Sequence, residues 1–211
     1  MDLEPATDRE GANGAKAMSE PTPPPRPSSR KRWVVGGLLL AVAVTVLVLG
    51  NMGVRTLEAR RTSEASESGS AAFARGDFVK AETALTQVAS SRTGDAATQA
   101  LLGRSREAQG NLTGAVEAYS ASLAASPRQP DVQYRVAVIE KTDGQNDKAI
   151  ASLKRALAAD ATFFPAHLLL AELYSSAGNR ADAVHELDAV IAQRPTGVDL
   201  DGLKERRATL Q

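Results

Sequence analysis

The chain contains no cysteine and only two histidines, His167 and His185, in 211 residues. The absence of cysteine excludes disulfides, thiolate zinc sites, catalysis by a thiol and a lipid anchor on an N-terminal cysteine. The two histidines lie on different predicted helices and lack a neighbouring cluster of carboxylates that would complete a metal site. We therefore expect no metal ion in this protein.

Aromatic residues make up only 4% of the chain, and neither charge sign is in excess, with 25 Lys and Arg against 25 Asp and Glu. A nucleic-acid-binding protein normally carries a basic surplus, so nucleic acid is not an expected partner. Alanine, by contrast, occurs 38 times. A chain rich in alanine and poor in aromatics suits closely packed helices better than strands.

The sequence motifs of common enzymes are also absent. The chain has no phosphate-binding GxxxxGK[ST], no dinucleotide-binding GxGxxG, no zinc-protease HExxH and no hydrolase GxSxG. The sequence therefore predicts a protein that is not an enzyme and binds no cofactor.

The first 32 residues hold six of the ten prolines and show no apolar periodicity. Such a segment cannot bury enough surface to offset the entropy lost on ordering, so we expect 1–32 to be a disordered, proline-rich tail. Its run at 21–27 has the PxxP spacing of a polyproline helix, which serves either as a ligand for an aromatic groove or as a stiff spacer.

Residues 33–54 carry no charged side chain (WVVGGLLLAVAVTVLVLGNMGV). As a helix this segment extends about 33 Å, slightly more than the ~30 Å hydrocarbon core of a bilayer. Leucine and valine favour its insertion, and Trp33 stands where an interfacial aromatic residue anchors a span. We expect a transmembrane helix over 33–54 in contact with the lipid bilayer, followed by a juxtamembrane linker over 55–61.

A cleaved secretion signal is the alternative to an uncleaved signal anchor. A signal would have an apolar region of about 7–15 residues and a small-x-small cleavage site, whereas the apolar stretch here is longer and lacks such a site. The basic residues on the two sides predict a cytoplasmic N-terminus and a periplasmic or otherwise extracytoplasmic C-terminal domain. They are Arg26, Arg30, Lys31 and Arg32 before the span, and Arg55, Arg60 and Arg61 after it.

Within the span, Gly37, Ala41 and Thr45 follow one another at intervals of four residues. Small residues at this spacing share one helix face, as in closely packed pairs of membrane helices. Homo- or hetero-association through this face is one hypothesis. Chance is the alternative, because glycine and alanine are common in any span.

After the span, the sequence repeats itself every 34 residues. Glycines recur at this interval, and each is followed five residues later by an alanine and nine residues later by leucine or tyrosine. These residues are Gly76, Gly110, Gly144 and Gly178, then Ala81, Ala115, Ala149 and Ala183, then Leu85, Tyr119, Leu153 and Leu187. Such a period predicts stacked helical hairpins, in which the glycine ends the first helix and the alanine lets two helices approach closely.

These residues resemble the tetratricopeptide repeat, a 34-residue helical hairpin with glycine at its fifteenth and alanine at its twentieth position. The register gives four repeats, at 62–95, 96–129, 130–163 and 164–197. The first repeat fits least well, with Ser68 in place of leucine and Thr93 in place of proline. Residues 198–211 are predicted to form a polar capping helix. The implied fold is all-α, a tetratricopeptide-type helical-hairpin solenoid behind one N-terminal transmembrane helix.

The resemblance also implies a binding groove, because the first helix of each tetratricopeptide hairpin lines a concave surface. The residues at groove-lining positions are Arg104 and Glu107, then Tyr134, Val138 and Lys141, then Leu168 and Glu172. The subclass that grips the acidic tail of a chaperone needs lysine and asparagine where this chain has Ser66 and Ser70, so that clamp is absent. For Tyr134 and Leu168, packing between adjacent first helices is the alternative role.

Together these features predict a single-pass, membrane-anchored scaffold or adaptor that binds protein or peptide partners in a bacterial envelope complex. The alternative is a structural subunit of a secretion, translocation, pilus or cytochrome-maturation complex, held mainly through its transmembrane helix. Loss of the partner on replacing the span, but not on mutating the groove, would favour this alternative.

Overall fold

The computed structural model describes residues 29–91 and 95–211, and the secondary structure of this part of the chain is entirely helical. The chain divides into two units, 1–52 and 53–211. Helix α1 (Ser29–Ala74) contributes to both units, and the remaining helices lie in the second. They are α2 (Phe78–Ser91), α3 (Ala96–Ala108), α4 (Leu112–Ala125), α5 (Pro130–Thr142), α6 (Asn146–Ala159), α7 (Phe164–Ser176), α8 (Arg180–Gln193) and α9 (Leu200–Thr209).

Of the tail expected at 1–32, residues 1–28 lie outside the described residues. Residues 29–32 are described and belong to α1, which begins at Ser29. The segment at 55–61, expected as a linker, is helical and continues without a break into the first helix of the first repeat. The residues from Leu40 to Val54 are all exposed. Among the described helices, α1 is the one long and apolar enough to cross a membrane, a criterion that a signal sequence also meets.

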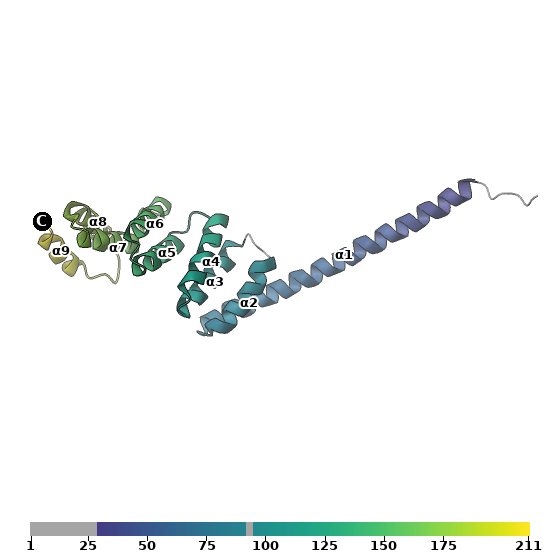
Figure 1. Cartoon of the computed structure of the whole chain (residues 1–211), viewed down its shortest axis with the longest axis horizontal. Helices are drawn as coiled ribbons and strands as arrows, with labels where there is room; N and C mark the ends of the chain where they lie inside the picture. The colour runs from purple at the N-terminus through teal and green to yellow at the C-terminus, as the bar shows by residue number, and fades with distance from the viewer. Residues whose placement is uncertain (1–28, 92–94) are drawn as a thin grey trace, which may run out of the picture. The chain divides into compact units, whose positions relative to one another are not determined.

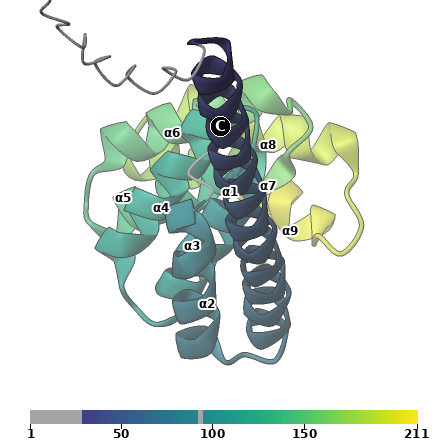
Figure 2. The same cartoon turned by 90° about the vertical axis from the view of Figure 1, so that its right-hand side faces the viewer.

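The 34-residue repeats fold into helical hairpins, as the sequence predicts. Helix α3 packs on α4, α5 on α6 and α7 on α8, and successive hairpins stack through α2 with α3, α4 with α5 and α6 with α7. In Figure 1, α2 to α9 follow one another in space in chain order, and the pairs α5 with α6 and α7 with α8 can also be followed in Figure 2. The all-α solenoid is therefore confirmed.

The repeated glycines end the first helices through one turn geometry. Their φ angles lie between 73° and 79°, in the left-handed region that favours glycine because it has no Cβ. In the second repeat, the N–H groups of Gly110 and Asn111 donate to the carbonyls of Glu107 and Arg106, each at 2.9 Å. These bonds satisfy carbonyls that the end of α3 would otherwise leave unpaired.

The core is made where a small residue on the first helix of a hairpin faces a larger one on the second. A Cβ added to Gly103 would lie 2.5 Å from two ring carbons of Tyr119, and one added to Gly69 would lie 2.8 Å from Cγ of Leu85. The four repeated alanines are completely buried. The leucine or tyrosine four positions after each alanine is also buried, with at most 1% of its surface exposed. The helices of each hairpin therefore approach to a distance that larger side chains would prevent.

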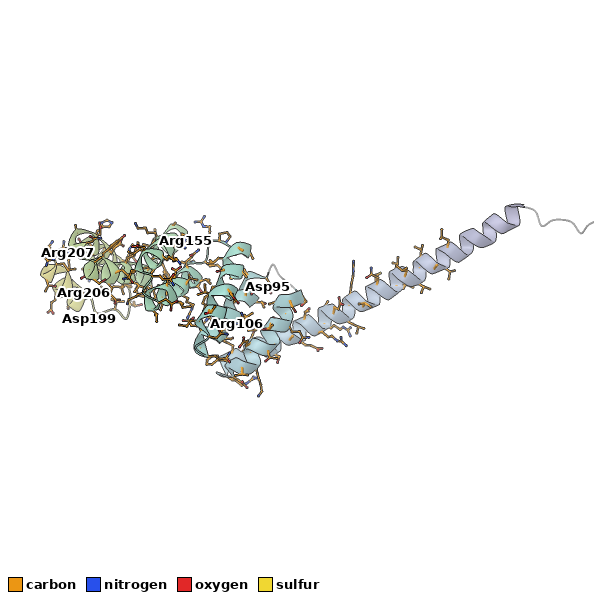
Figure 3. The ribbon with its side chains drawn as sticks, viewed as in Figure 1. Asp95, Arg106, Arg155, Asp199, Arg206 and Arg207 are labelled. Carbon is orange, nitrogen blue, oxygen red and sulfur yellow. The ribbon has the colours of Figure 1, made fainter. Side chains whose placement is uncertain are left out.

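Polar side chains cap the starts of α3 and α9, and others connect α9 to α8. The carboxylate of Asp95 accepts hydrogen bonds from the N–H groups of Ala97 and Thr98 at the start of α3, and Asp199 accepts one from Gly202 at the start of α9. Both aspartates are labelled in Figure 3. Arg207 on α9 contacts Asp188 on α8 with two guanidinium nitrogens, and this hydrogen bonding holds the pKa of Asp188 below its ordinary value. Helix α9 thus covers the end of the solenoid as the expected cap.

Candidate functional site

The seven residues predicted to line a groove all lie on α3, α5 and α7, the first helices of repeats two to four. We call the surface they form the first-helix face. Six of them are half-buried and Glu172 is exposed, so none belongs to the fully buried core. Because the hairpins stack in register, side chains from three helices up to 68 positions apart share this surface.

The middle of the first-helix face is partly occupied by packing. The ring of Tyr134 meets that of Phe163 edge to face, with centroids 5.8 Å apart. Tyr134 and Val138 also pack against the buried cluster that contains Leu170. Each therefore has a structural contact on one side and remains partly accessible on the other. Leu168 is half-buried on α7 and is not among the residues packed on a core cluster.

Two charged residues of the predicted set form an ion pair between neighbouring first helices. Nζ of Lys141 on α5 lies 2.5 Å from Oε1 of Glu172 on α7. Both side chains are partly solvated, so the pair contributes little to stability. The pair places one cation and one anion side by side on the first-helix face, so the two residues together add no net charge to it.

A hollow of about 280 Å³ opens where the first-helix face meets the first repeat. Two of the predicted residues, Arg104 and Glu107, line this hollow. Its other lining residues are Phe73, Phe78, Ala108 and Arg135. Phe73 occupies the twelfth position of the first repeat, a groove-lining position, so the repeat register could have identified it. Arg135 falls at a sixth position, for which the register gives no such signal.

Two arginines and one glutamate line this hollow, and only one of the arginines contacts the glutamate. Glu107 accepts a hydrogen bond of 2.5 Å from the hydroxyl of Tyr119 and one of 3.1 Å from Nη1 of Arg135. Burial, together with the hydrogen bond to Glu107, raises the pKa of Tyr119 far above its ordinary value, so the hydroxyl remains a neutral donor. Arg104 instead lies over the ring of Phe73, with Cζ 4.9 Å from the ring centroid.

The histidines differ in their surroundings. Nδ1 of His167 lies 2.6 Å from Oε2 of Glu186 on α8, and Nε2 lies 3.1 Å from the carbonyl oxygen of Ala161. His167 therefore joins the two helices of the fourth hairpin, a partnership that sequence spacing alone does not show. His185 is exposed. Within the described residues, no group of three or more His, Asp or Glu side chains is arranged to hold a metal ion.

The small-residue stripe of the predicted span lies on an open face of α1. Gly37 is exposed, and a Cβ added to it would meet no atom within 4 Å. The hydroxyl of Thr45 donates to the carbonyl oxygen of Ala41 at 2.8 Å, so it is satisfied within its own helix. Association through this stripe stays a hypothesis.

Several solved structures are similar to the solenoid. A crystal structure of MamA protein is 19% identical, with a TM-score of 0.62 over 72% of this chain and 88% of that one. A MamA segment from Desulfovibrio magneticus RS-1 is 17% identical, with a TM-score of 0.61 over 71% and 89%. A tetratricopeptide repeat protein from Parabacteroides merdae is 19% identical, with a TM-score of 0.65 over 72% and 60%. Similarity at this level of identity establishes the fold alone.

None of the curated proteins matches the sequence. Sequence models described as tetratricopeptide repeat match residues 67–130, 100–163 and 142–206, which together cover well over half of the chain. The matched segments include all seven residues of the first-helix face and extend into the capping helix. Since the sequence models and the helical hairpins agree, the chain belongs to the tetratricopeptide repeat family.

Proposed function

We propose that this protein is a single-pass, membrane-anchored adaptor whose solenoid holds a peptide segment of a partner protein, within an envelope complex. The observation that carries the proposal is the first-helix face, where half-buried apolar and charged side chains from three helices surround an open surface. Tetratricopeptide domains are protein-interaction scaffolds, and the chain belongs to that family. The proposed role is binding, and it includes no catalytic step.

The proposed anchor is the apolar part of α1. Large apolar side chains from Leu40 to Leu57 are exposed, each with about half or more of its surface accessible in this single chain. Water would solvate so much contiguous apolar surface poorly, whereas a bilayer would cover it. The proposed orientation has the N-terminus in the cytosol, because the basic residues before the span outnumber those after it.

The orientation predicts the behaviour of reporter fusions. A reporter that is active only outside the cytosol should be active at position 211, and a reporter that is active only in the cytosol should be active at position 20. The expected cause is the basic cluster at 26–32, which resists translocation. Replacing its four Lys and Arg residues by Gln should weaken or invert this preference. A cytosol-active reporter at 211 would contradict the orientation, and a mature chain without residues 1–54 would show a cleaved signal instead of an anchor.

The groove predicts which variants lose their partners. A triple variant with Tyr134→Ala, Val138→Ala and Lys141→Glu should lose partners that co-purify with the wild-type protein in mild detergent. Truncating an anchoring aromatic residue costs about 1–2 kcal/mol or more of binding free energy, and reversing Lys141 changes the charge of the surface. Quantitative mass spectrometry of the co-purified proteins measures the loss.

The control is a triple variant on the second helices, with Val79→Ala, Lys154→Glu and His185→Ala, because all three residues are exposed on α2, α6 and α8. It should retain the partners. A charge swap, Lys141→Glu with Glu172→Lys, preserves the ion pair while exchanging its ends, so it tests polarity without disturbing the fold. Partners that remain on a folded groove variant, but leave when 33–54 is replaced by an unrelated apolar helix, would favour the structural-subunit alternative.

A further inference from the structure

The basic residues of the first helices are matched by carboxylates, with one exception. Helices α3, α5 and α7 contain four Lys and Arg residues, and three of these contact a carboxylate. The pairs are Arg106 with Glu82 at 2.9 Å, Arg135 with Glu107 at 3.1 Å, and Lys141 with Glu172 at 2.5 Å. Over the described part of the chain, no carboxylate lies within ion-pair distance of Arg104, so it is the one Lys or Arg of these three helices without a carboxylate partner.

The position of Arg104 leaves its hydrogen-bond donors available. Cζ of its guanidinium lies over the ring of Phe73, a cation–π contact in which the ring supplies no oxygen acceptor. The five N–H donors lie in the guanidinium plane and point outward from its edges. The contact with Phe73 therefore leaves N–H donors for a ligand, and the fork of a guanidinium binds a carboxylate through two parallel hydrogen bonds.

The carboxylate already in the hollow does not cancel this charge. Glu107 is occupied by the hydroxyl of Tyr119 and by Arg135. The hollow therefore contains two guanidinium groups and one carboxylate, which leaves one positive charge. Phe73 and Phe78, whose rings meet edge to face with centroids 5.5 Å apart, form an apolar wall beside it.

The volume limits what can bind there. About 280 Å³ is slightly below the ~300 Å³ at which small-molecule pockets begin, so the hollow suits one or two side chains better than a whole cofactor. One unpaired cation matches one carboxylate. The apolar wall matches an apolar side chain next to it.

We propose that the hollow between Phe73, Arg104 and Arg135 is a subsite for one internal Asp or Glu side chain of a bound peptide, next to an apolar residue. This inference rests on the proposed function, because it assigns the charge that the peptide carries at one end of the groove. A peptide that presents a free C-terminal carboxylate in addition to acidic side chains would bring more negative charge than Arg104 alone can match.

The test is selection of peptides by the full-length protein in detergent micelles. A phage-displayed library of random dodecapeptides, which have no free C-terminus, is panned on the wild type and on Arg104→Gln. The wild type should enrich sequences with Asp or Glu beside an aromatic or aliphatic residue, and Arg104→Gln should lose this acidic preference. Enriched peptides, synthesised with both ends capped, are then measured by fluorescence anisotropy together with counterparts that carry Gln or Asn in place of the acid.

Arg104→Gln should weaken binding of the acidic peptide about tenfold or more, since the bond to a charged group is lost, and should leave the neutral counterpart nearly unchanged. Arg104→Lys should bind the acidic peptide with an affinity between those of the wild type and Arg104→Gln, because lysine keeps the charge but lacks the planar guanidinium. Arg155→Gln is the matched control, an exposed arginine on α6 labelled in Figure 3, and should have no effect. Raising the salt concentration should weaken binding of the acidic peptide to the wild type more than binding to Arg104→Gln.

The outcomes separate this proposal from the proposed function. If peptides enrich and the groove triple variant loses them, but Arg104→Gln binds acidic and neutral peptides as the wild type does, the groove is correct and the acidic subsite is wrong. If uncapping the C-terminus of a neutral peptide restores the dependence on Arg104, the ligand is a terminal carboxylate, which also overturns the inference. If no peptide enriches on the wild type, the proposed peptide-binding function fails and this inference fails with it.

Discussion

Replacing Gly103 with alanine is expected to destabilise the solenoid by about 2–3 kcal/mol. The new Cβ would lie 2.5 Å from both Cδ1 and Cε1 of Tyr119. This ring is completely buried, and its hydroxyl is held by Glu107, so it cannot turn aside without breaking a hydrogen bond. The midpoint of urea unfolding of the full-length protein in detergent, followed by far-ultraviolet circular dichroism, measures the loss.

The third hairpin of the same chain indicates which second substitution should compensate for this change. At the same positions the third hairpin has Ala137 with Leu153, which share one buried cluster. A double variant with Gly103→Ala and Tyr119→Leu recreates that pairing and should recover most of the lost stability, less the hydrogen bond to Glu107. Gly53→Ala is the control, because a Cβ there meets no atom within 4 Å. Equal midpoints for Gly103→Ala and the wild type would show that this hairpin is not packed as described.

Replacing Ala149 with leucine should cost about 3 kcal/mol, at the upper end of what overpacking usually costs. Ala149 is completely buried where α6 crosses α5, in the cluster that also contains Ala137 and Ala166. Three additional carbon atoms fit there only if the hairpin opens. Ala115→Leu makes the same change in the second hairpin, where Ala115 is also completely buried, and should have a similar effect on the urea midpoint.

Two substitutions elsewhere show whether this effect comes from packing. Ala151→Leu places the same side chain on the exposed side of α6, two residues from Ala149. His185→Ala removes an exposed side chain from α8. Each should change stability by no more than about 0.5 kcal/mol. If Ala149→Leu and Ala151→Leu shift the midpoint equally, the repeated alanine does not lie at a helix crossing and the repeat register is wrong.

The proposed anchor and the proposed groove predict different dependences on salt concentration. The proposed peptide binding at Arg104 is electrostatic and should weaken as salt rises, because Arg104 is only half-buried. The proposed membrane attachment through α1 is apolar and should persist in high salt, since burial of hydrocarbon surface does not depend on charge. A protein that leaves the membrane in high salt would be held there by a partner or by lipid head groups and not by a span.

The sequence by itself determines the helical hairpins of this protein. Local rules suffice for this result: glycine adopts the positive φ that ends each first helix, and alanine at the twentieth position permits close approach. Repetition at 34 residues then dictates stacking, because a single hairpin leaves an apolar face uncovered. The continuity of α1 through 55–61 was missed, although no proline there interrupts the helix.

Only the tertiary structure decided which polar side chains pair across the first-helix face. Arg135 contacts Glu107 from 28 positions away, while Arg104, three residues from Glu107, lies over the ring of Phe73. Arg135 thus reaches a carboxylate on a neighbouring first helix and Arg104 reaches a ring, a difference that depends on the distances between packed helices and on side-chain rotamers. Sequence spacing describes neighbours along one helix, whereas these partners lie on different hairpins, and their pairing exists only once the solenoid has stacked.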